Sequence, residues 1–596
     1  MFDKLLIKID AINQYRRTKI SNRNFLILAA LLVGILAGLA AAILKSLTHH
    51  IEEFLQNDLE WKYKYFLYLF LPMIGIFLSV LYVRRFIRKG KFEPGLTPIL
   101  YAISRKSSKI ETHNIYSQII TAAITVGFGG SVGLESPIVA SGSGIGSALG
   151  RFLGLSYRET TMLLACGAAA GIAGAFNSPI AGMVFAIEIL LPEFTIPAFI
   201  PLLLASATAA VVARVFYTGQ LFYLVTEGWK MNALIWYVVL AVLIGLFSIY
   251  FNKAYYAIKH FFAAVNHPYK KVVVGGLALG GMLFLFPTLY GEGYITIKQL
   301  LSGYHSAVIG NSIFSDYSGI PIAVIGFTLV TIFAKSVATL VTLSAGGNGG
   351  TFAPSLVMGG LIGFLVAYTV NASGIAQLNV ANFIVAGMAA SLSSIMHAPL
   401  TGIFLIAEIT GGYVLMVPLM ITSAISYFIN RSTYKNSIYT KPLAESGELL
   451  SLEDKDTTVL NMMKLRHLLE KDYLLLDESD TISSRMNDIL QSKRNLFPVV
   501  GSDKSFKGLI YVEEILKREL NNPEHETLTV HDLMASAPQV LLLTDNLQIV
   551  LEKMEQENVW LLPVLDDQAR FLGFVSKTAI FNKYRAMLRR QADYLS

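Results

Sequence analysis

Charged side chains are scarce in this sequence. Asp, Glu, Lys and Arg make up 15% of its 596 residues, whereas about 25% is usual in soluble domains. The scarcity excludes an ordinary soluble globular protein, and a hydrophobic content of 54% agrees. Residues 445–596 nevertheless hold 43 of the 89 charged residues. We therefore expect a large membrane body followed by a smaller water-soluble C-terminal domain.

Cysteine is almost absent as well. The single Cys166 excludes an intramolecular disulfide, a multi-cysteine metal site and a redox pair. The sequence shows no Ser/His/Asp, metal-binding or phosphate-loop constellation and no nucleic-acid motif. We therefore expect no enzyme, no metal site, no required cofactor and no nucleic-acid partner.

Long stretches of the body carry no formal charge. The first apolar run is Asn24–Leu44, and similar runs cover Tyr65–Val83, Met231–Asn252 and Val272–Gly291. Two longer stretches hold one carboxylate each: Glu135 lies within Thr112–Gly150, and Glu408 lies within Ser336–Asn430. Because about 20 apolar residues span a bilayer as a helix, the body contains many spans. Gly and Pro interrupt the longest stretches, and such broken helices are typical of transporters and channels.

The basic residues predict the orientation of the body. Residues 1–23 are polar and basic and show no cleavable signal peptide, so the positive-inside rule places this end in the cytoplasm. A second basic cluster after the second apolar run would also be cytoplasmic: Arg84, Arg85, Arg88, Lys89 and Lys91. The net charge of +7 is explained by these loops.

The membrane body contains an internal repeat. Pro179, Gly182 and Glu188 recur 220 residues later as Pro399, Gly402 and Glu408. Upstream, the motif 133–137 (Gly-Leu-Glu-Ser-Pro) is echoed 217 residues later by 350–354 (Gly-Thr-Phe-Ala-Pro). The matches predict duplicated halves at about 25–215 and 230–430, which in transporters often meet at a central site.

Each of the two upstream motifs can begin a helix, since proline is favoured in a first helical turn. The free N–H groups of such helix ends bind anions without a basic side chain. Glu135 stands in one motif, and an ionisable residue within the membrane is functional by default. A carboxylate there would compete with the anion and would release the site when it is protonated or displaced. For Glu188 and Glu408 we favour a structural role as acceptors at helix ends.

These motifs resemble those of the CLC family of chloride channels and chloride/proton antiporters, over about residues 25–444. The resemblance implies about eighteen helices in two inverted halves, and a homodimer in the lipid bilayer with one anion pore per subunit. It also implies that Glu135 is the gating glutamate and that Tyr439, rather than Tyr434, meets the central anion. The implied anion-binding residues are Pro94, Gly95, Gly133, Leu134, Gly350, Thr351, Phe352, Ala353 and Tyr439.

One departure from the family lies in the first anion-binding segment. The family pattern G-S-G-I-P is best matched by residues 93–97 (Glu-Pro-Gly-Leu-Thr), with Pro98 as another choice for the motif proline. Pro94 then replaces the serine whose hydroxyl binds chloride, and proline offers neither a side-chain donor nor an N–H. Proline at this place accompanies nitrate preference in plant relatives, so nitrate joins chloride as a candidate substrate.

A second departure concerns protons. Proton-coupled relatives usually carry a second glutamate directly after the position of Glu188, but Ile189 stands there. Channel members have an aliphatic residue at this place. Glu193, one turn beyond, could substitute as a proton entry, but a surface charge is the favoured interpretation. We therefore predict a voltage- or pH-gated chloride channel that conducts passively, with a chloride or nitrate/proton antiporter as the alternative. A CBS-containing divalent-cation transporter is a weaker rival, since the broken segments offer only Glu135, Glu188 and Glu408 as carboxylates. A membrane sensor is another, since a mere anchor needs no broken helices.

Residues 445–596 contain a repeat of their own. Two positions recur with a shift of 65 residues, so that Pro498 and Gly508 correspond to Pro563 and Gly573. The pattern resembles a tandem pair of CBS domains, an α/β module, at about 470–520 and 535–590. We expect it to be cytoplasmic, after an N-terminal segment 1–24 and a membrane domain 25–444, in the inner membrane of a bacterium.

CBS pairs can bind adenine nucleotides, usually through an Asp three residues after a Ser or Thr. The first unit has Tyr511 and Glu514 at these places, and the second has Ser576 and Ala579. Because the Asp is missing from both, a structural and dimerising role is favoured over nucleotide binding. Tyr511, Glu514 and Ser576 are the candidate nucleotide ligands.

Overall fold

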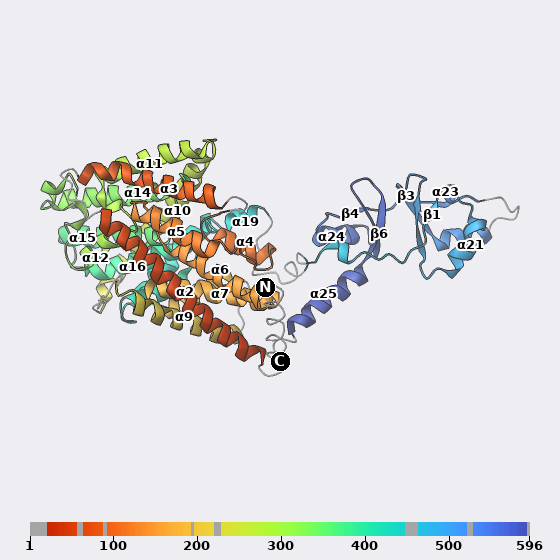
Figure 1. Cartoon of the computed structure of the whole chain (residues 1–596), viewed down its shortest axis with the longest axis horizontal. Helices are drawn as coiled ribbons and strands as arrows, with labels where there is room; N and C mark the ends of the chain where they lie inside the picture. Colours follow the sequence, from red (N-terminus) through yellow and green to blue (C-terminus); the bar gives the residue numbers. More distant parts are fainter. Residues whose placement is uncertain are drawn as a thin grey trace. The chain divides into compact units, whose positions relative to one another are not determined.

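The structure of the protein is a computed structural model that describes residues 21–55, 64–87, 92–191, 196–219, 228–310, 312–446, 460, 463–520 and 528–592. The chain divides into two compact units, residues 1–449 and 450–596 (Figure 1). The basic residues before Ser21, together with Arg88, Lys89, Lys91 and Glu193, lie outside the described residues.

The described residues of the first unit form eighteen α-helices, eight of which are long and apolar enough to cross a bilayer. The first half contains α2 (Asn22–Glu53), α3 (Lys64–Phe86), α4 (Thr97–Arg105), α5 (Asn114–Gly127), α6 (Glu135–Phe152), α7 (Tyr157–Phe176), α8 (Pro179–Phe185) and α9 (Ile196–Phe216). The second half contains α10 (Leu234–Ala263), α11 (Pro268–Leu285), α12 (Tyr294–Leu301), α13 (Ala307–Gly310), α14 (Pro321–Ser344), α15 (Phe352–Ala372), α16 (Val380–Met396), α17 (Pro399–Ile409), α18 (Met416–Thr433) and α19 (Lys441–Glu445).

Equivalent helices of the two halves end in the same way. The residue after α7 is Asn177, with φ of 57°, and the residue after α16 is His397, with φ of 59°. Both lie in the left-handed region, which stops a helix. The next helices, α8 and α17, then begin at Pro179 and Pro399, where a proline at the first position loses no helical hydrogen bond. The internal repeat of the sequence is therefore also a repeat of structure.

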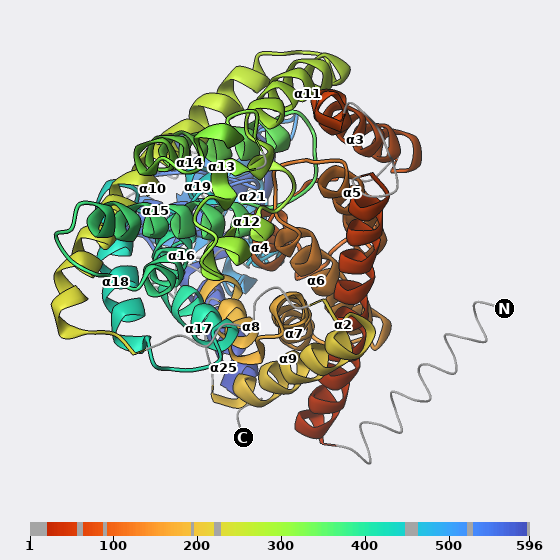
Figure 2. The ribbon, with the colours of Figure 1, turned by 90° about the vertical axis from the view of Figure 1, so that its left-hand side faces the viewer.

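Glycine allows the closest helix pairs to touch backbone to backbone. A β-carbon on Gly142 of α6 would overlap the carbonyl oxygen of Gly167 in α7, and the reverse also holds. Gly359 of α15 and Gly387 of α16 have the same relationship. Small residues at interfaces let membrane helices approach closely. Figure 2 shows α6 beside α7, with α2 packed along both and α9 along α7.

Burial separates the inner helices from the outer ones. Of the 18 most apolar consecutive residues in each helix, 94% are buried in α7 and 83% in α15, against 28% in α3. The inner helices are therefore enclosed by protein, whereas α3 presents apolar side chains such as Phe70, Ile74 and Phe77 to its surroundings. This arrangement places the first turns of α6 and α15 inside the unit, away from lipid.

The second unit contains two small sheets with the same design. The first has β1 (Leu476–Asp477), β2 (Leu496–Val500) and β3 (Phe506–Tyr511), and the second has β4 (Leu541–Leu542), β5 (Leu561–Leu565) and β6 (Phe571–Ser576). In each sheet the first and second strands run parallel, and the second and third strands run antiparallel. Four helices lie between and after these strands: α21 (Ile482–Gln491), α22 (Val512–Leu520), α24 (Leu547–Gln556) and α25 (Lys577–Ala592), with the short α23 (Val530–Leu533) before β4.

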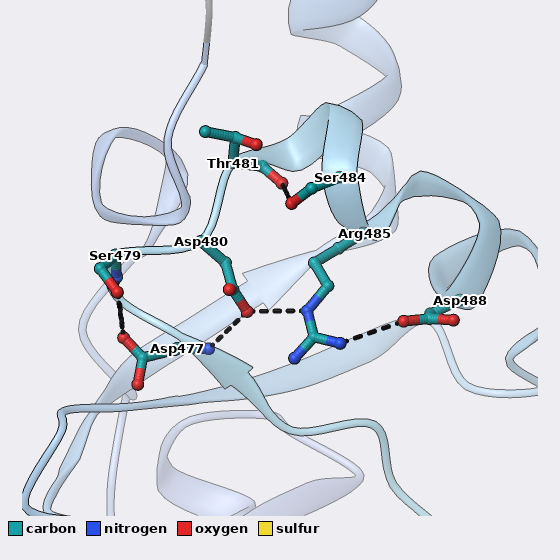
Figure 3. Close-up of polar contacts among 7 residues, drawn as sticks. All are labelled: Asp477, Ser479, Asp480, Thr481, Ser484, Arg485 and Asp488. Carbon is teal, nitrogen blue, oxygen red and sulfur yellow. Dashed lines mark hydrogen bonds and ion pairs between the residues drawn. The ribbon is translucent and has the colours of Figure 1, made fainter.

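An aspartate shapes the same turn in both repeats. The Asp480 carboxylate accepts the N–H of Asp477 at 3.2 Å and pairs with Arg485 at 2.7 Å (Figure 3). Its equivalent, Asp545, accepts the N–H of Leu542 at 3.1 Å and pairs with Lys553 at 2.9 Å. Both turns lead from a strand into a helix, so these aspartates have a structural role.

Candidate functional site

The two helix-opening motifs of the membrane unit meet at their glycines. The N–H of Gly133 donates to the carbonyl of Gly350 at 2.8 Å, and the N–H of Gly350 donates to the carbonyl of Gly133 at 2.9 Å. This reciprocal pair holds the first turns of α6 and α15 together. Positive helix ends from both halves therefore point into one buried region.

Glu135, the first residue of α6, lies between these helix ends and is only 3% exposed. Its Oε2 accepts the N–H of Ala353 at 3.3 Å, and its Oε1 accepts the hydroxyl of Tyr294 at 2.9 Å. The carboxylate thus lies on a free backbone N–H at the start of α15, where helix ends attract anions.

Tyr439 reaches the same region from the segment that precedes α19. Its hydroxyl lies 2.6 Å from the hydroxyl of Thr351, and the side chain is 8% exposed. Tyr434 instead lies near the Lys441 ammonium, with 5.9 Å between Nζ and the ring centre. The structure therefore brings Tyr439, and not Tyr434, to the start of α15.

The segment with Pro94 and Gly95 also approaches this tyrosine. Gly95 has φ of 91°, and the chain then enters α4. The Thr97 hydroxyl in the first turn of α4 donates to the carbonyl of Tyr439 at 3.0 Å. The structure therefore joins three of the sequence-predicted segments: the one before α4, the start of α15 and the one before α19.

Comparison with known protein families agrees with this geometry. The family model described as voltage gated chloride channel matches residues 75–431, and the CBS domain model matches residues 530–586. The chain belongs to the CLC family of chloride channels and transporters. It carries a CBS domain at its C-terminal end, and it is a multi-pass membrane protein of anion transport rather than an enzyme.

Several bacterial CLC proteins are similar in sequence. An H(+)/Cl(-) exchange transporter ClcA of Vibrio vulnificus is 29% identical over 444 residues, which cover 71% of this chain and 90% of the relative. The ClcA of Vibrio cholerae is 27% identical over 469 residues, covering 75% and 95%. A ClcB-like relative from Ralstonia nicotianae, whose name describes a chloride channel, is 30% identical over 336 residues, covering 54% and 73%.

Solved CLC structures share the fold. A slow cyanobacterial Cl-/H+ antiporter has a TM-score of 0.60 at 23% identity, covering 74% of this chain and all of that one. A eukaryotic CLC transporter has a TM-score of 0.59 at 17% identity, covering 94% and 99%. The predicted fold class, a multi-helix CLC body followed by an α/β CBS region, is confirmed.

Glu188 and Glu408 act as helix-end acceptors. Glu188 lies in a short π-helical stretch, Ala186–Leu190, that continues α8. Its carboxylate accepts the N–H groups of Leu400 and Thr401 at 3.0 and 2.8 Å. Ile189 follows it in the same stretch, so neither residue supplies a free carboxylate there.

Three buried or half-buried charged residues near Glu135 are missing from the site predicted from the sequence. They are Glu292, Lys335 and Lys45, and each stands directly beside a charge-free run: after Gly291, before Ser336 and after Leu44. Glu292 adds a carboxylate to the three that the sequence assigns to the broken segments, Glu135, Glu188 and Glu408. Charges next to apolar runs were the available signal, but they suggest the ends of spans, whereas Lys335 lies inside α14.

The candidate nucleotide ligands of the CBS region are engaged in local contacts. The Ser576 hydroxyl donates to Glu470 and accepts the N–H of Ala579 at 3.0 Å. Glu514 pairs with Lys517 at 3.1 Å, and Tyr511 is 41% exposed. Among these residues, only the Tyr511 side chain is presented outward without a described side-chain partner.

Proposed function

We propose that this protein carries chloride across a bacterial inner membrane in exchange for protons, with Glu135 as the gate. The observation that carries the proposal is the Glu135 carboxylate on the N–H of Ala353, where it competes with an anion. A proton on this carboxylate removes its charge and weakens its hold on the helix end. The exchange transporters among its relatives support coupling to protons.

Passive chloride conduction is the second candidate, and Ile189 favours it. This side chain cannot carry a proton, and Glu188 beside it is held by Leu400 and Thr401. A proton that reaches Glu135 from outside would then have no carboxylate route onward to the inner side. In that case Glu135 would open and close the pore without strict exchange.

Flux measurements on purified protein in liposomes separate the two candidates. For exchange, we expect an outward chloride gradient to drive protons inward against their own gradient at a fixed ratio. Glu135→Gln should abolish that proton movement and the dependence of chloride flux on pH, while the protein still elutes as one folded species. Chloride flux without proton movement would instead establish the passive channel.

The remaining assignments are part of the same proposal. The protein forms a homodimer with one pore per subunit, and both termini lie in the cytoplasm. Pro94 and Gly95 form the inner anion segment and favour nitrate alongside chloride.

Residues 470–520 and 535–590 form a CBS pair that is chiefly structural, with Tyr511, Glu514 and Ser576 as the candidate ligands for an adenine nucleotide. Binding of ATP or AMP to the purified protein by calorimetry tests this last assignment.

A further inference from the structure

A second carboxylate lies directly beside the gate. Glu292 stands in the turn between Gly291 and Gly293, which have φ of 57° and 92° and lead into α12. Its Oε1 accepts the N–H of Leu134 at 3.2 Å. Leu134 immediately precedes Glu135, so Glu292 occupies a free N–H at the start of α6 while the gate itself occupies one at the start of α15.

Two lysines lie near Glu292 and bind backbone carbonyls around it. Lys335 is 1% exposed, and its ammonium donates to the carbonyls of Leu289 and Gly291 at 3.2 and 2.9 Å. Its charge acts on Glu292, as does that of Lys45, whose ammonium donates to the Ala175 carbonyl. A buried ammonium is costly unless opposite charge and acceptors are near, so these lysines depend on the carboxylates.

The other titratable groups around Glu292 come from four elements. Glu135 at the start of α6 and Glu52 near the end of α2 both interact with it electrostatically. Tyr294, the first residue of α12, donates to Glu135, and Tyr217 directly follows α9 within range of the Glu292 and Glu52 charges. Together with Lys45 and Lys335, these groups form a cluster around Glu292, which contacts the residue before Glu135.

The position of α2 indicates which side of the membrane this cluster faces. The helix has 32 residues and is about 48 Å long, enough to cross the bilayer. With the N-terminus in the cytoplasm, as proposed above, Lys45 and Glu52 lie in its outward half. A proton from the outer solution would therefore meet this cluster on its way to Glu135.

We infer that Glu292 is a positioning residue for the gate, which sets the external pH at which Glu135 takes up its proton and leaves the anion site. The inference rests on the proposed role of Glu135. Glu292 acts in two ways. First, it accepts the N–H of Leu134, so that the Glu135 carboxylate turns to the N–H of Ala353. Second, its negative charge favours a proton on the Glu135 carboxylate, because two nearby carboxylates resist being ionised together.

Chloride flux in liposomes, measured against external pH, tests this inference. Glu292→Gln keeps an oxygen for the Leu134 N–H but removes the charge. We expect the half-maximal flux to move by about one pH unit toward acid, since one neighbouring negative charge is lost. Lys335→Gln removes the positive charge that favours an ionised Glu292 and should move it in the same direction. The control is Glu408→Gln, which should leave the midpoint where it is in the wild type. Glu408 is a half-buried carboxylate outside the cluster that also accepts backbone N–H groups.

The outcomes separate this inference from the function on which it rests. If Glu135→Gln keeps its pH response, Glu135 is not the gate and the proposed function fails together with the inference. If Glu135→Gln loses the response while Glu292→Gln titrates like the wild type, the gate stands and the role of Glu292 is overturned. If Lys335→Gln does not fold, the comparison of Glu292→Gln with Glu408→Gln still decides, because each keeps an acceptor for its helix end.

Discussion

Glu188 and Glu408 cap each other's helices across the two halves of the membrane unit. The Glu408 carboxylate in α17 accepts the N–H groups of Ile180 and Ala181 in α8, at 3.0 and 2.8 Å. The Glu188 carboxylate accepts the equivalent N–H groups at the start of α17. Each half therefore supplies the negative charge that the other half's helix end requires.

Loss of either of these two glutamate caps should destabilise the membrane unit. Glu408→Ala leaves the N–H groups of Ile180 and Ala181 without their acceptor, at a cost of about 1–3 kcal/mol for each buried group. We expect a lower midpoint of thermal unfolding in detergent and unchanged selectivity among anions in the protein that remains folded. Glu408→Gln, which keeps one acceptor oxygen, should lose less. Equal midpoints for Glu408→Ala and the wild type would contradict the capping role.

Gly133→Ala should imitate the loss of the gate. A β-carbon at Gly133 would overlap the Glu135 carboxylate and would lie 2.9 Å from the β-carbon of Ala353. We therefore expect Glu135 to leave the N–H of Ala353 and chloride flux to become less dependent on pH. Gly281→Ala in α11 is the control, because nothing lies within 4 Å of its added carbon. A pH response like that of the wild type in Gly133→Ala would show that Glu135 keeps its place.

Pro94→Ser should shift the preference toward chloride over nitrate. The substitution supplies a hydroxyl and a backbone N–H next to Gly95, on the segment that Thr97 ties to Tyr439. One added donor is worth about 1 kcal/mol, or roughly fivefold in relative affinity. The ratio of chloride to nitrate flux in liposomes measures this, with Pro98→Ser as the control for the other alignment. A larger shift in Pro98→Ser would assign the anion segment to that proline.

Arg494 should link the two repeats of the CBS region. Its guanidinium contacts Glu470 and Asp472, both at 2.6 Å, and Glu470 exchanges backbone hydrogen bonds with Phe574 in β6. Arg494→Met should therefore speed hydrogen exchange in β2 and β6 of the full-length protein. The increase should correspond to a loss of about 1 kcal/mol in the free energy of local opening. Exchange confined to β2 would mean that Arg494 does not connect the repeats.

The same contact has a defined pH dependence. Arg494 lowers the pKa of Asp472 below the ordinary aspartate value, which is about 3.9. A carboxylate with a lowered pKa contributes stability above its unfolded-state pKa and loses it as the pH falls through the folded-state value. The difference in the free energy of opening between the wild type and Arg494→Met, obtained from hydrogen exchange, should thus be constant near neutral pH. It should shrink only below about pH 4. Because Asp472 is 72% exposed, its share is small.

The parts of the site that the sequence predicted are those with a local signature. Glu135, Thr351 and Tyr439 stand in short motifs in which glycine, proline and a functional group recur at fixed spacing, so a single segment reveals them. The duplicated order also predicted that two helix ends would meet. The anion-transport family is confirmed on this basis. Passive conduction remains one of two candidates, because proton coupling depends on a route rather than on one motif.

Glu292 could not be found in the same way. It contacts Leu134, 158 positions earlier in the chain, and its supporting lysines come from α2 and α14. Nothing within ten residues of Glu292 indicates those partners. The glycines on either side of it indicate a turn, but only the packing of the distant helices α2, α6 and α14 shows that the turn faces Glu135.

The reciprocal bond between Gly133 and Gly350 has a consequence for the ancestry of the chain. A half-length ancestor that paired with a second copy of itself would bring this residue against its own counterpart on the twofold axis. A β-carbon at Gly133 would press against Ala353 in the first turn of α15, and one at Gly350 would overlap Ser136 in the first turn of α6, so the pair requires glycine on both sides. In a fused chain the equivalent positions beside the glycines are free to differ, and here Glu135 in one half corresponds to Phe352 in the other.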